Sequence, residues 1–421
     1  MKVDVEELGA CKRRLQVEET PEVVQEAWAR AFTRVQREAK LPGFRKGKVP
    51  RSMVKLHFSN DVRQEVARHL IPEVYRQALA ETQLKPVEEP DLQEVTLEES
   101  APLKFSAVVE IKPTIALGQY AGLAVQHAAR SFTEAEVDEA LAHLQEQQAE
   151  YRAVERPADV GDLVIVDYSL TPEGMEPRTE TGYGLVIGSG AVLKEIDEAV
   201  IGLGPGGARQ TRVRFPDDHR NEALRGKAAD AEVKVSEVKE KVLPPIDDDF
   251  AKTMGQFETL DALRAEMRKG LERRRQQENR RALEDAVIEA ALAAHTFEVP
   301  ESMVLRQVGH QIEHVREQMR RQGMDPSLVP WDYQKMLEDM RPSAEKAVKR
   351  ALLIEAIAQK ENIQASDEDL EKKIDELAKE ANQAVAVVRK YFKGPQERQG
   401  LSLRLREEKT IEFLKGQAKY S

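Results

Sequence analysis

Residues 41–50 have the sequence LPGFRKGKVP, and this stretch separates two segments with helical patterns. Pro42 disfavours a helical conformation for the residue before it, and Gly43 permits a turn, so the preceding helix is predicted to end here. Phe44 is a large apolar residue between Gly43 and Gly47, where burial against the flanking helices is not assured. The stretch is therefore predicted to be a loop that joins two helices.

Basic residues gather in and around this loop. Between Arg34 and Arg51 there are seven basic residues and one acidic residue, Glu38. Arginine and lysine side chains contact phosphates, and an apolar anchor such as Phe44 inserts or stacks beside them. A solvated turn of a helical hairpin is the commoner fate of such a loop. Composition alone leaves both interpretations open.

The segments on either side of the loop predict a small α+β domain that ends near Pro113. Thr20 and Pro21 form a helix start, as an N-cap residue followed by a proline at the first helical position. Apolar residues then recur at helical spacing. The helical segments are 20–40 and about 51–82, and the strand-like segments are 2–18 and 92–112.

Composition changes twice further along the chain. Residues 114–132 are predicted to be a linker, and the motif at 133–136 resembles a capping box that opens a charged helix to about Arg152. Residues 157–243 are rich in Gly, Pro and Val and contain short strand patterns, which predicts a mostly β domain. From Pro244 the pattern is helical. Helix caps or breaks are expected near Pro300, Pro326, Pro330, Pro342, Ser366 and Pro395.

Length and composition narrow the functional classes. A chain of 421 residues is too long for one ordinary core and predicts two to four domains. A net charge of −11 argues against a surface that binds nucleic acid throughout, DNA included. No run of 18 apolar residues and no apolar leader occur, so we expect a soluble cytoplasmic protein without membrane contact. Cys11 is the only cysteine, which excludes an internal disulfide and a cysteine-based zinc cluster.

The apolar faces of the helical region allow two interpretations. In the first, the helices form a self-contained bundle whose stripes all face inward. In the second, modest faces of Ala, Leu and Met are partly exposed and bind other chains. Because most apolar stripes belong to cores, the residues alone favour the bundle. The charged content of 33% and the aromatic content of only 5% favour long, solvated helices over an aromatic-rich enzyme core.

Three further motifs are weighed as sites and mostly dismissed. Residues 202–207 fit G-x-G-x-x-G but lead into a strand pattern, whereas a dinucleotide fingerprint must open a helix. Residues 310–314 fit H-x-x-E-H, which can hold zinc with Glu313 as a base, but no third ligand is evident. Residues 264–281 contain eight basic and three acidic residues. They are predicted to form the solvated face of a helix, with a secondary RNA contact as the weaker alternative.

Residues 43–50, GFRKGKVP, resemble the GFRxGxxP ribosome-docking signature of bacterial trigger factor. The order of regions is similar to that family over essentially the full length, and residues 244–251, PPIDDDFA, are similar to its junction after the FKBP-like domain. The resemblance implies an α+β multidomain fold. Its expected parts are a ribosome-binding domain at 1–113, a linker and connecting helix at 114–152, an FKBP-like domain at 153–243 and a long, all-helical chaperone domain at 244–421.

The resemblance also implies a function. It is that of an ATP-independent chaperone that docks on the large ribosomal subunit beside the peptide exit and holds nascent polypeptides during folding and export. The family's helical domain supplies arms that cradle nascent chains, which reverses the preference for a closed bundle. Weak self-association away from the ribosome is implied, and we expect no cofactor and no metal. The docking residues carried over are Gly43, Phe44, Arg45, Lys46, Gly47 and Pro50. Arg45 and Lys46 are expected to provide electrostatic docking and Phe44 an apolar anchor, while Gly43, Gly47 and Pro50 set the shape of the loop.

The middle region resembles an FKBP-type peptidyl-prolyl cis-trans isomerase at 161–168, 188–190 and 215–218. Such an enzyme holds proline in an apolar, largely aromatic pocket that favours the twisted amide. The pocket residues carried over are Tyr168, Val192, Leu193 and Ile196, while Pro177, His219 and Ala231 stand where aromatic residues are expected.

With so little aromatic area, isomerase activity is predicted to be weak or absent. Prolyl isomerisation as the principal activity is the alternative, and a zinc hydrolase that uses His310 and His314 is a remote one.

Overall fold

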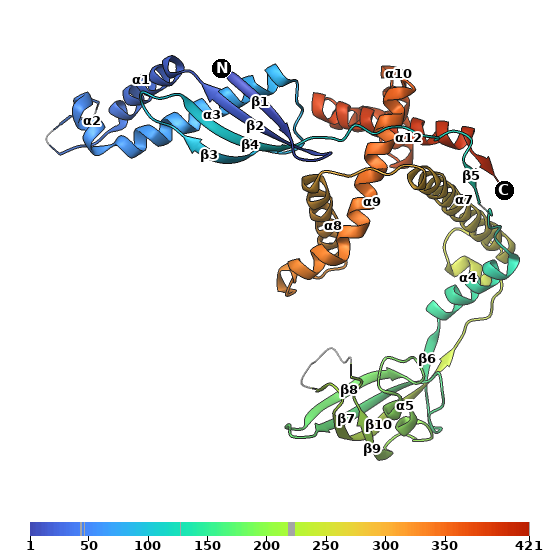
Figure 1. Cartoon of the computed structure of the whole chain (residues 1–421). Coiled ribbons are helices and arrows are strands. Elements are labelled where there is room, and N and C mark those ends of the chain that lie inside the picture. Colours follow the sequence, from blue (N-terminus) through green and yellow to red (C-terminus); the bar gives the residue numbers. More distant parts are fainter. Residues whose placement is uncertain (43, 46, 127, 218–223, 421) are drawn as a thin grey trace. The chain divides into compact units, whose positions relative to one another are not determined.

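The computed structural model describes residues 1–42, 44–45, 47–126, 128–217 and 224–420 (Figure 1). The chain divides into two compact units. One unit combines Met1–Ala128 with Arg281–Ser421, and the other is Ala129–Arg280. Helices and strands are segregated into a mixed N-terminal part, a β-rich middle part and a helical C-terminal part, which confirms the predicted α+β multidomain class.

The N-terminal part of the first unit is a four-stranded antiparallel sheet covered by helices, with strand order β1-β2-β4-β3. Leu15 of β2 and Leu103 of β4 are fully buried in a core that also holds Trp28 of α1. The second predicted helical stretch is interrupted at Phe58 and forms two helices. The bounds are β1 Lys2–Glu7, β2 Lys12–Glu19, α1 Pro21–Glu38, α2 Arg51–His57, α3 Ser59–Thr82, β3 Asp91–Thr96 and β4 Leu103–Glu110.

The connector after β4 belongs to the core of the helical part of the same unit. Tyr120 is buried in a cluster formed with α7 (Leu260–Ala293), α9 (Tyr333–Lys360) and α12 (Pro395–Gln417). The Gly118 N–H donates to Nε2 of the buried His295 at 3.0 Å. Strand β5 (Ala124–Val125) pairs in parallel with β11 (Lys419–Tyr420), so the chain's last described residues fasten the connector.

Among the described residues, the helical part contains four buried clusters, and its helices α8 and α9 pack against each other around one of them. The break expected near Pro342 is wrong, because this proline lies inside α9. Pro342 is exposed, so water can satisfy the carbonyl group that its missing N–H leaves free. The bounds are α7 Leu260–Ala293, α8 Glu301–Arg321, η2 Pro326–Leu328, α9 Tyr333–Lys360, α10 Asp367–Glu380, α11 Val385–Tyr391 and α12 Pro395–Gln417.

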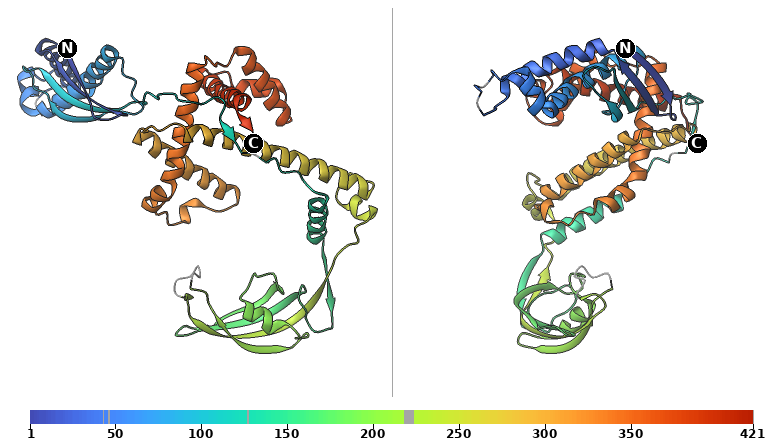
Figure 2. Two further views of the ribbon diagram at one scale, coloured as in Figure 1. Left: turned by 45° about the vertical axis from the view of Figure 1, so that its right-hand side comes forward. Right: turned by 60° about the vertical axis from the view of Figure 1, so that its left-hand side comes forward.

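The second unit is built around a five-stranded antiparallel sheet in which β10 pairs with β6, β7 and β9, and β7 pairs with β8. Helix α5 packs against this sheet (Figure 2). The helix predicted from residue 133 ends at Gln147 rather than near Arg152, because the following residues form β6. The bounds are α4 Glu134–Gln147, β6 Glu150–Val154, β7 Leu163–Pro172, β8 Arg178–Val186, α5 Lys194–Val200, β9 Ala208–Arg214, β10 Ala228–Val242 and α6 Asp248–Thr253.

Within the same unit, α4, α6 and the beginning of α7 share a small apolar cluster that contains Leu141, Phe250 and Leu263. No helix in the described ranges is both long enough and apolar enough to cross a membrane.

Candidate binding surfaces

The loop between α1 and α2 is shaped by its own backbone. The Phe44 N–H donates to Leu41 O at 3.1 Å, and the Lys48 N–H donates to Arg45 O at 2.9 Å. Gly47 has φ = 77°, a left-handed conformation that favours glycine. Pro50 then precedes the first residue of α2 in an extended conformation. Two residues of the predicted docking set, Gly43 and Lys46, lie outside the described residues.

One end of the loop is fixed to the domain and the other part is open. Val49 is fully buried, and its carbonyl group accepts a hydrogen bond from Gln36 Nε2 at 2.5 Å. Phe44, in contrast, is 41% exposed, and Arg45 is exposed beside it. A buried attachment that carries an exposed aromatic side chain is an arrangement suited to contact with a partner.

The cations of this segment differ in what they contact. Arg34 pairs with Glu65 at 2.5 Å, and the Arg51 guanidinium lies 4.7 Å from the centroid of the Phe32 ring. The remaining described cations have no carboxylate within ion-pair distance among the residues that the structure describes. These are Arg37, Lys40, Arg45 and Lys48, and all four are exposed.

The second basic segment, 264–281, is neutralised instead. Arg268 forms two hydrogen bonds with Glu134 of α4, at 2.9 and 2.7 Å, and these hold the pKa of that carboxyl below its usual value. Arg264 pairs with Asp138 at 2.9 Å. The prediction of a solvated helix face is therefore only partly right, because α4 covers part of that face with carboxylates.

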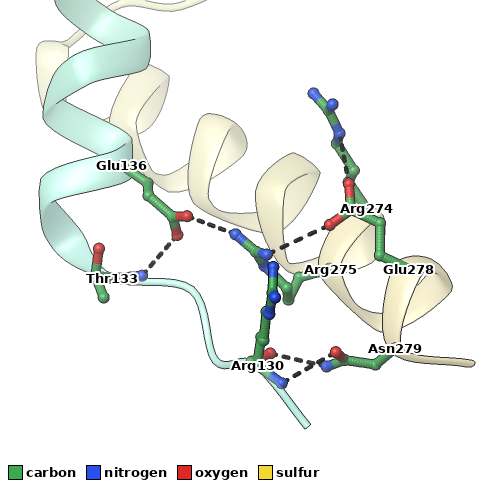
Figure 3. Close-up of polar contacts among 7 residues, drawn as sticks. All are labelled: Arg130, Thr133, Glu136, Arg274, Arg275, Glu278 and Asn279. Carbon is green, nitrogen blue, oxygen red and sulfur yellow. Dashed lines mark hydrogen bonds and ion pairs between the residues drawn. The ribbon is translucent and has the colours of Figure 1, made fainter. Parts of the chain in front are cut away.

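Figure 3 shows the centre of this seam between α4 and α7. Glu136 accepts a hydrogen bond from the Thr133 N–H at 2.9 Å, the predicted capping contact, and also pairs with Arg275 at 2.5 Å. Glu278 pairs with Arg274 at 3.1 Å and with Arg275 at 3.4 Å, as the spacing predicts. These contacts satisfy the arginines within the protein.

Two hydrogen bonds between uncharged groups extend the contact between the linker and α7. The Arg130 N–H donates to Asn279 Oδ1 at 3.0 Å, and Asn279 Nδ2 donates to Arg130 O at 2.8 Å (Figure 3). One side-chain amide thus satisfies both backbone groups of Arg130, three residues before the α4 cap, which fixes the linker on α7.

The predicted isomerase pocket residues contact one core cluster in the β-rich part. Tyr168, Val192 and Leu193 are half-buried around it, and Ile196 is buried within it. The Tyr168 hydroxyl donates to Glu180. Burial, aided by this hydrogen bond, raises the pKa of Tyr168 to about 12, so the phenol stays neutral.

Sequence reasoning missed a second aromatic residue at this position. Tyr183 of β8 lies edge-on to Tyr168, with 5.7 Å between ring centroids. The signal available was the two-residue alternation of β8, which places Tyr183 on the same face as the buried Leu185. Ala231 is buried and Pro177 is exposed, and His219 lies outside the described residues.

Two of the weighed motifs receive structural explanations. Residues 202–207 form a turn before strand β9, as predicted, and not a helix start. Glu313 of the H-x-x-E-H motif pairs with Arg320 and Arg316, which lower the pKa of its carboxyl and make it a weaker base. No group of three metal-ligating side chains is found in the described part of the chain.

The helical part exposes apolar side chains despite its buried clusters. Leu328 of η2 is 81% exposed, and Tyr391 at the end of α11 is 70% exposed. A closed bundle would bury such residues. Other large exposed apolar side chains of this part include Leu305, Met324, Val329, Tyr333, Val387 and Leu403.

An exposed cationic loop, a β-rich domain and helices with exposed apolar side chains are features of a multidomain protein that acts by binding other macromolecules. A family model described as bacterial trigger factor protein matches residues 1–144, and one described as its C-terminus matches residues 259–416. The chain therefore belongs to the bacterial trigger factor family of ribosome-associated chaperones.

Individual relatives agree with this assignment. The trigger factor of Moorella thermoacetica is 37% identical over 398 residues, which cover 93% of this chain and 89% of the relative. That of Carboxydothermus hydrogenoformans is 34% identical over 430 residues and covers both chains completely. A solved trigger factor structure is similar in fold, with a TM-score of 0.53 and 21% identity, and covers 99% of each chain.

Proposed function

We propose that this chain docks beside the peptide exit of the large ribosomal subunit through the loop at 41–50. The observation that carries the proposal is the set of exposed cations around the exposed Phe44 that have no carboxylate partner among the described residues. Ribosomal RNA presents phosphates that such cations neutralise, and counterion release then favours binding. Arg45 and Lys46 supply charge, Phe44 is the apolar anchor, and Gly43, Gly47 and Pro50 shape the loop.

The helical part then holds nascent and unfolded polypeptides. Its exposed leucine, methionine and tyrosine side chains offer shallow apolar contacts that suit many sequences and release them without nucleotide. The protein works in the cytoplasm, partly bound to ribosomes and partly free, where it self-associates weakly.

The experiment is co-sedimentation with bacterial ribosomes across a salt series, comparing the wild type with Phe44→Ala/Arg45→Ala/Lys46→Ala. We expect salt-sensitive binding of the wild type and loss of binding by the variant, with an unchanged melting temperature. Equal sedimentation of both proteins at every salt concentration would mean that the loop is only a hairpin turn.

A second activity, prolyl isomerisation, is supported by the Tyr168–Tyr183 pair. We infer that it is weak, because aliphatic Ile196 and buried Ala231 occupy positions where the FKBP framework has aromatic residues. Turnover of a prolyl peptide comparable to that of an ordinary FKBP would contradict this inference, and Tyr168→Ala should abolish whatever activity is measured.

A further inference from the structure

Helix α2 begins directly after Pro50 and lies at the same end of the N-terminal domain as the loop (Figure 1). Val54 of this helix is fully buried in the domain core. Leu56, two residues later, is 71% exposed. Among the large apolar side chains that the structure describes, only Leu328 is more exposed.

The arginine and lysine side chains of α2 are already engaged within the domain. Arg51 stacks on Phe32, and Lys55 pairs with Glu99. These contacts orient the helix, so Leu56 is displayed on a fixed element rather than on a mobile end.

A single exposed leucine is ordinary on protein surfaces. Leu56 differs because the neighbouring loop carries a second exposed apolar residue, Phe44, and the exposed cations Arg45 and Lys48, which have no ion-pair partner in the part of the chain that the structure describes. Apolar side chains among free cations complement a partner that is anionic overall and has apolar recesses.

We propose that Leu56 is a second apolar anchor for the ribosome and inserts between apolar side chains of a ribosomal protein at the docking site. This inference rests on the proposed function. A branched aliphatic side chain cannot stack on a nucleobase as an aromatic ring does, so its favourable partner is protein, while the loop cations contact phosphate.

The test measures the dissociation constant for non-translating bacterial ribosomes at several salt concentrations. Leu56→Gln should raise it about tenfold at every salt concentration, the loss expected when a buried leucine becomes polar. The slope of log K against log salt should stay unchanged, because no phosphate contact is removed. Val160→Gln is the control, a comparable change at a similarly exposed aliphatic residue (66%) outside both the loop and the helical part, and should bind within about twofold of wild type.

A second measurement identifies the partner. Leu56→Cys labelled with a photo-crosslinker should form adducts with a ribosomal protein, and the buried Cys11 leaves one reactive thiol. Adducts with ribosomal RNA alone would overturn the inference. So would unchanged ribosome binding by Leu56→Gln combined with lost self-association, which would assign the residue to contact with a second copy.

The two hypotheses fail separately. If Leu56→Gln binds like wild type while Phe44→Ala/Arg45→Ala/Lys46→Ala does not, the second anchor is wrong and loop docking stands. If both variants bind like wild type, the proposed docking itself is wrong.

Discussion

Two segments of this chain are similarly rich in basic residues but have different electrostatic surroundings. Residues 34–51 lie in a helical hairpin whose carboxylates are too few to neutralise it, so Arg37, Lys40, Arg45 and Lys48 remain without ion pairs among the described residues. Residues 264–281 are met by acidic side chains of α4 and of their own helix. A basic run therefore indicates a docking surface only when the fold brings no carboxylates to it.

The largest effect should come from removing free cations. Arg45→Ala/Lys48→Ala is expected to weaken ribosome binding roughly a hundredfold at low salt and to reduce the salt slope by about two. The matched change in the other segment, Arg273→Ala/Arg274→Ala, should leave the affinity for ribosomes within about twofold of that of the wild type. Comparable losses in both variants, measured by co-sedimentation, would show that total charge matters and would break the comparison.

The next largest effect concerns the stability of the contact between α4 and α7. Glu136→Ala removes both the capping contact with Thr133 and the pair with Arg275, and should cost about 1–2 kcal/mol locally. Amide hydrogen exchange in α4 would then accelerate by roughly 5- to 30-fold. Glu139→Ala is the control, because Glu139 is exposed on the same helix and makes neither contact. Equal acceleration in both variants would contradict this role for Glu136.

A smaller effect is expected from lowering the pH, which should weaken the ion pairs of the second segment but not change Arg45 and Lys48 in the first. Arg268 lowers the pKa of Glu134 below its ordinary value of 4.5, so the pair stabilises the fold above that pH and is lost as the pH falls through the lowered pKa. Among the described residues, Arg45 and Lys48 have no such carboxylate partner to lose. The protection of α4 amides against hydrogen exchange, corrected for the intrinsic exchange rate, should fall between pH 6 and pH 3. The fall should be less steep in the Glu134→Gln variant than in the wild type. If protection falls equally with pH in the wild type and in Glu134→Gln, Glu134 contributes nothing to the stability of α4, as is common for exposed ion pairs.

Local patterns were sufficient to predict much of the fold. The helix start at Thr20–Pro21 and the strand at 163–168 depend on neighbouring residues, and both are confirmed. The neutralisation of Arg268 could not be predicted, because Glu134 lies 134 residues away in sequence and only the tertiary fold brings them together. Tyr183 was missed for a different reason, since a single tyrosine on a short strand has no motif that marks it as part of a pocket.

The smallest expected effect tests whether free cations alone are enough. Glu278→Gln releases Arg274 from its pair and leaves Arg275 bonded to Glu136, at a cost of about 0.3–0.5 kcal/mol for a pair at this helical spacing. The change creates an exposed, unpaired arginine in the second segment without an apolar anchor beside it. Because docking combines charge neutralisation with apolar burial, ribosome affinity should rise by less than about twofold, as measured by titration at low salt. A larger rise would mean that unpaired charge suffices for docking and that Phe44 and Leu56 are dispensable.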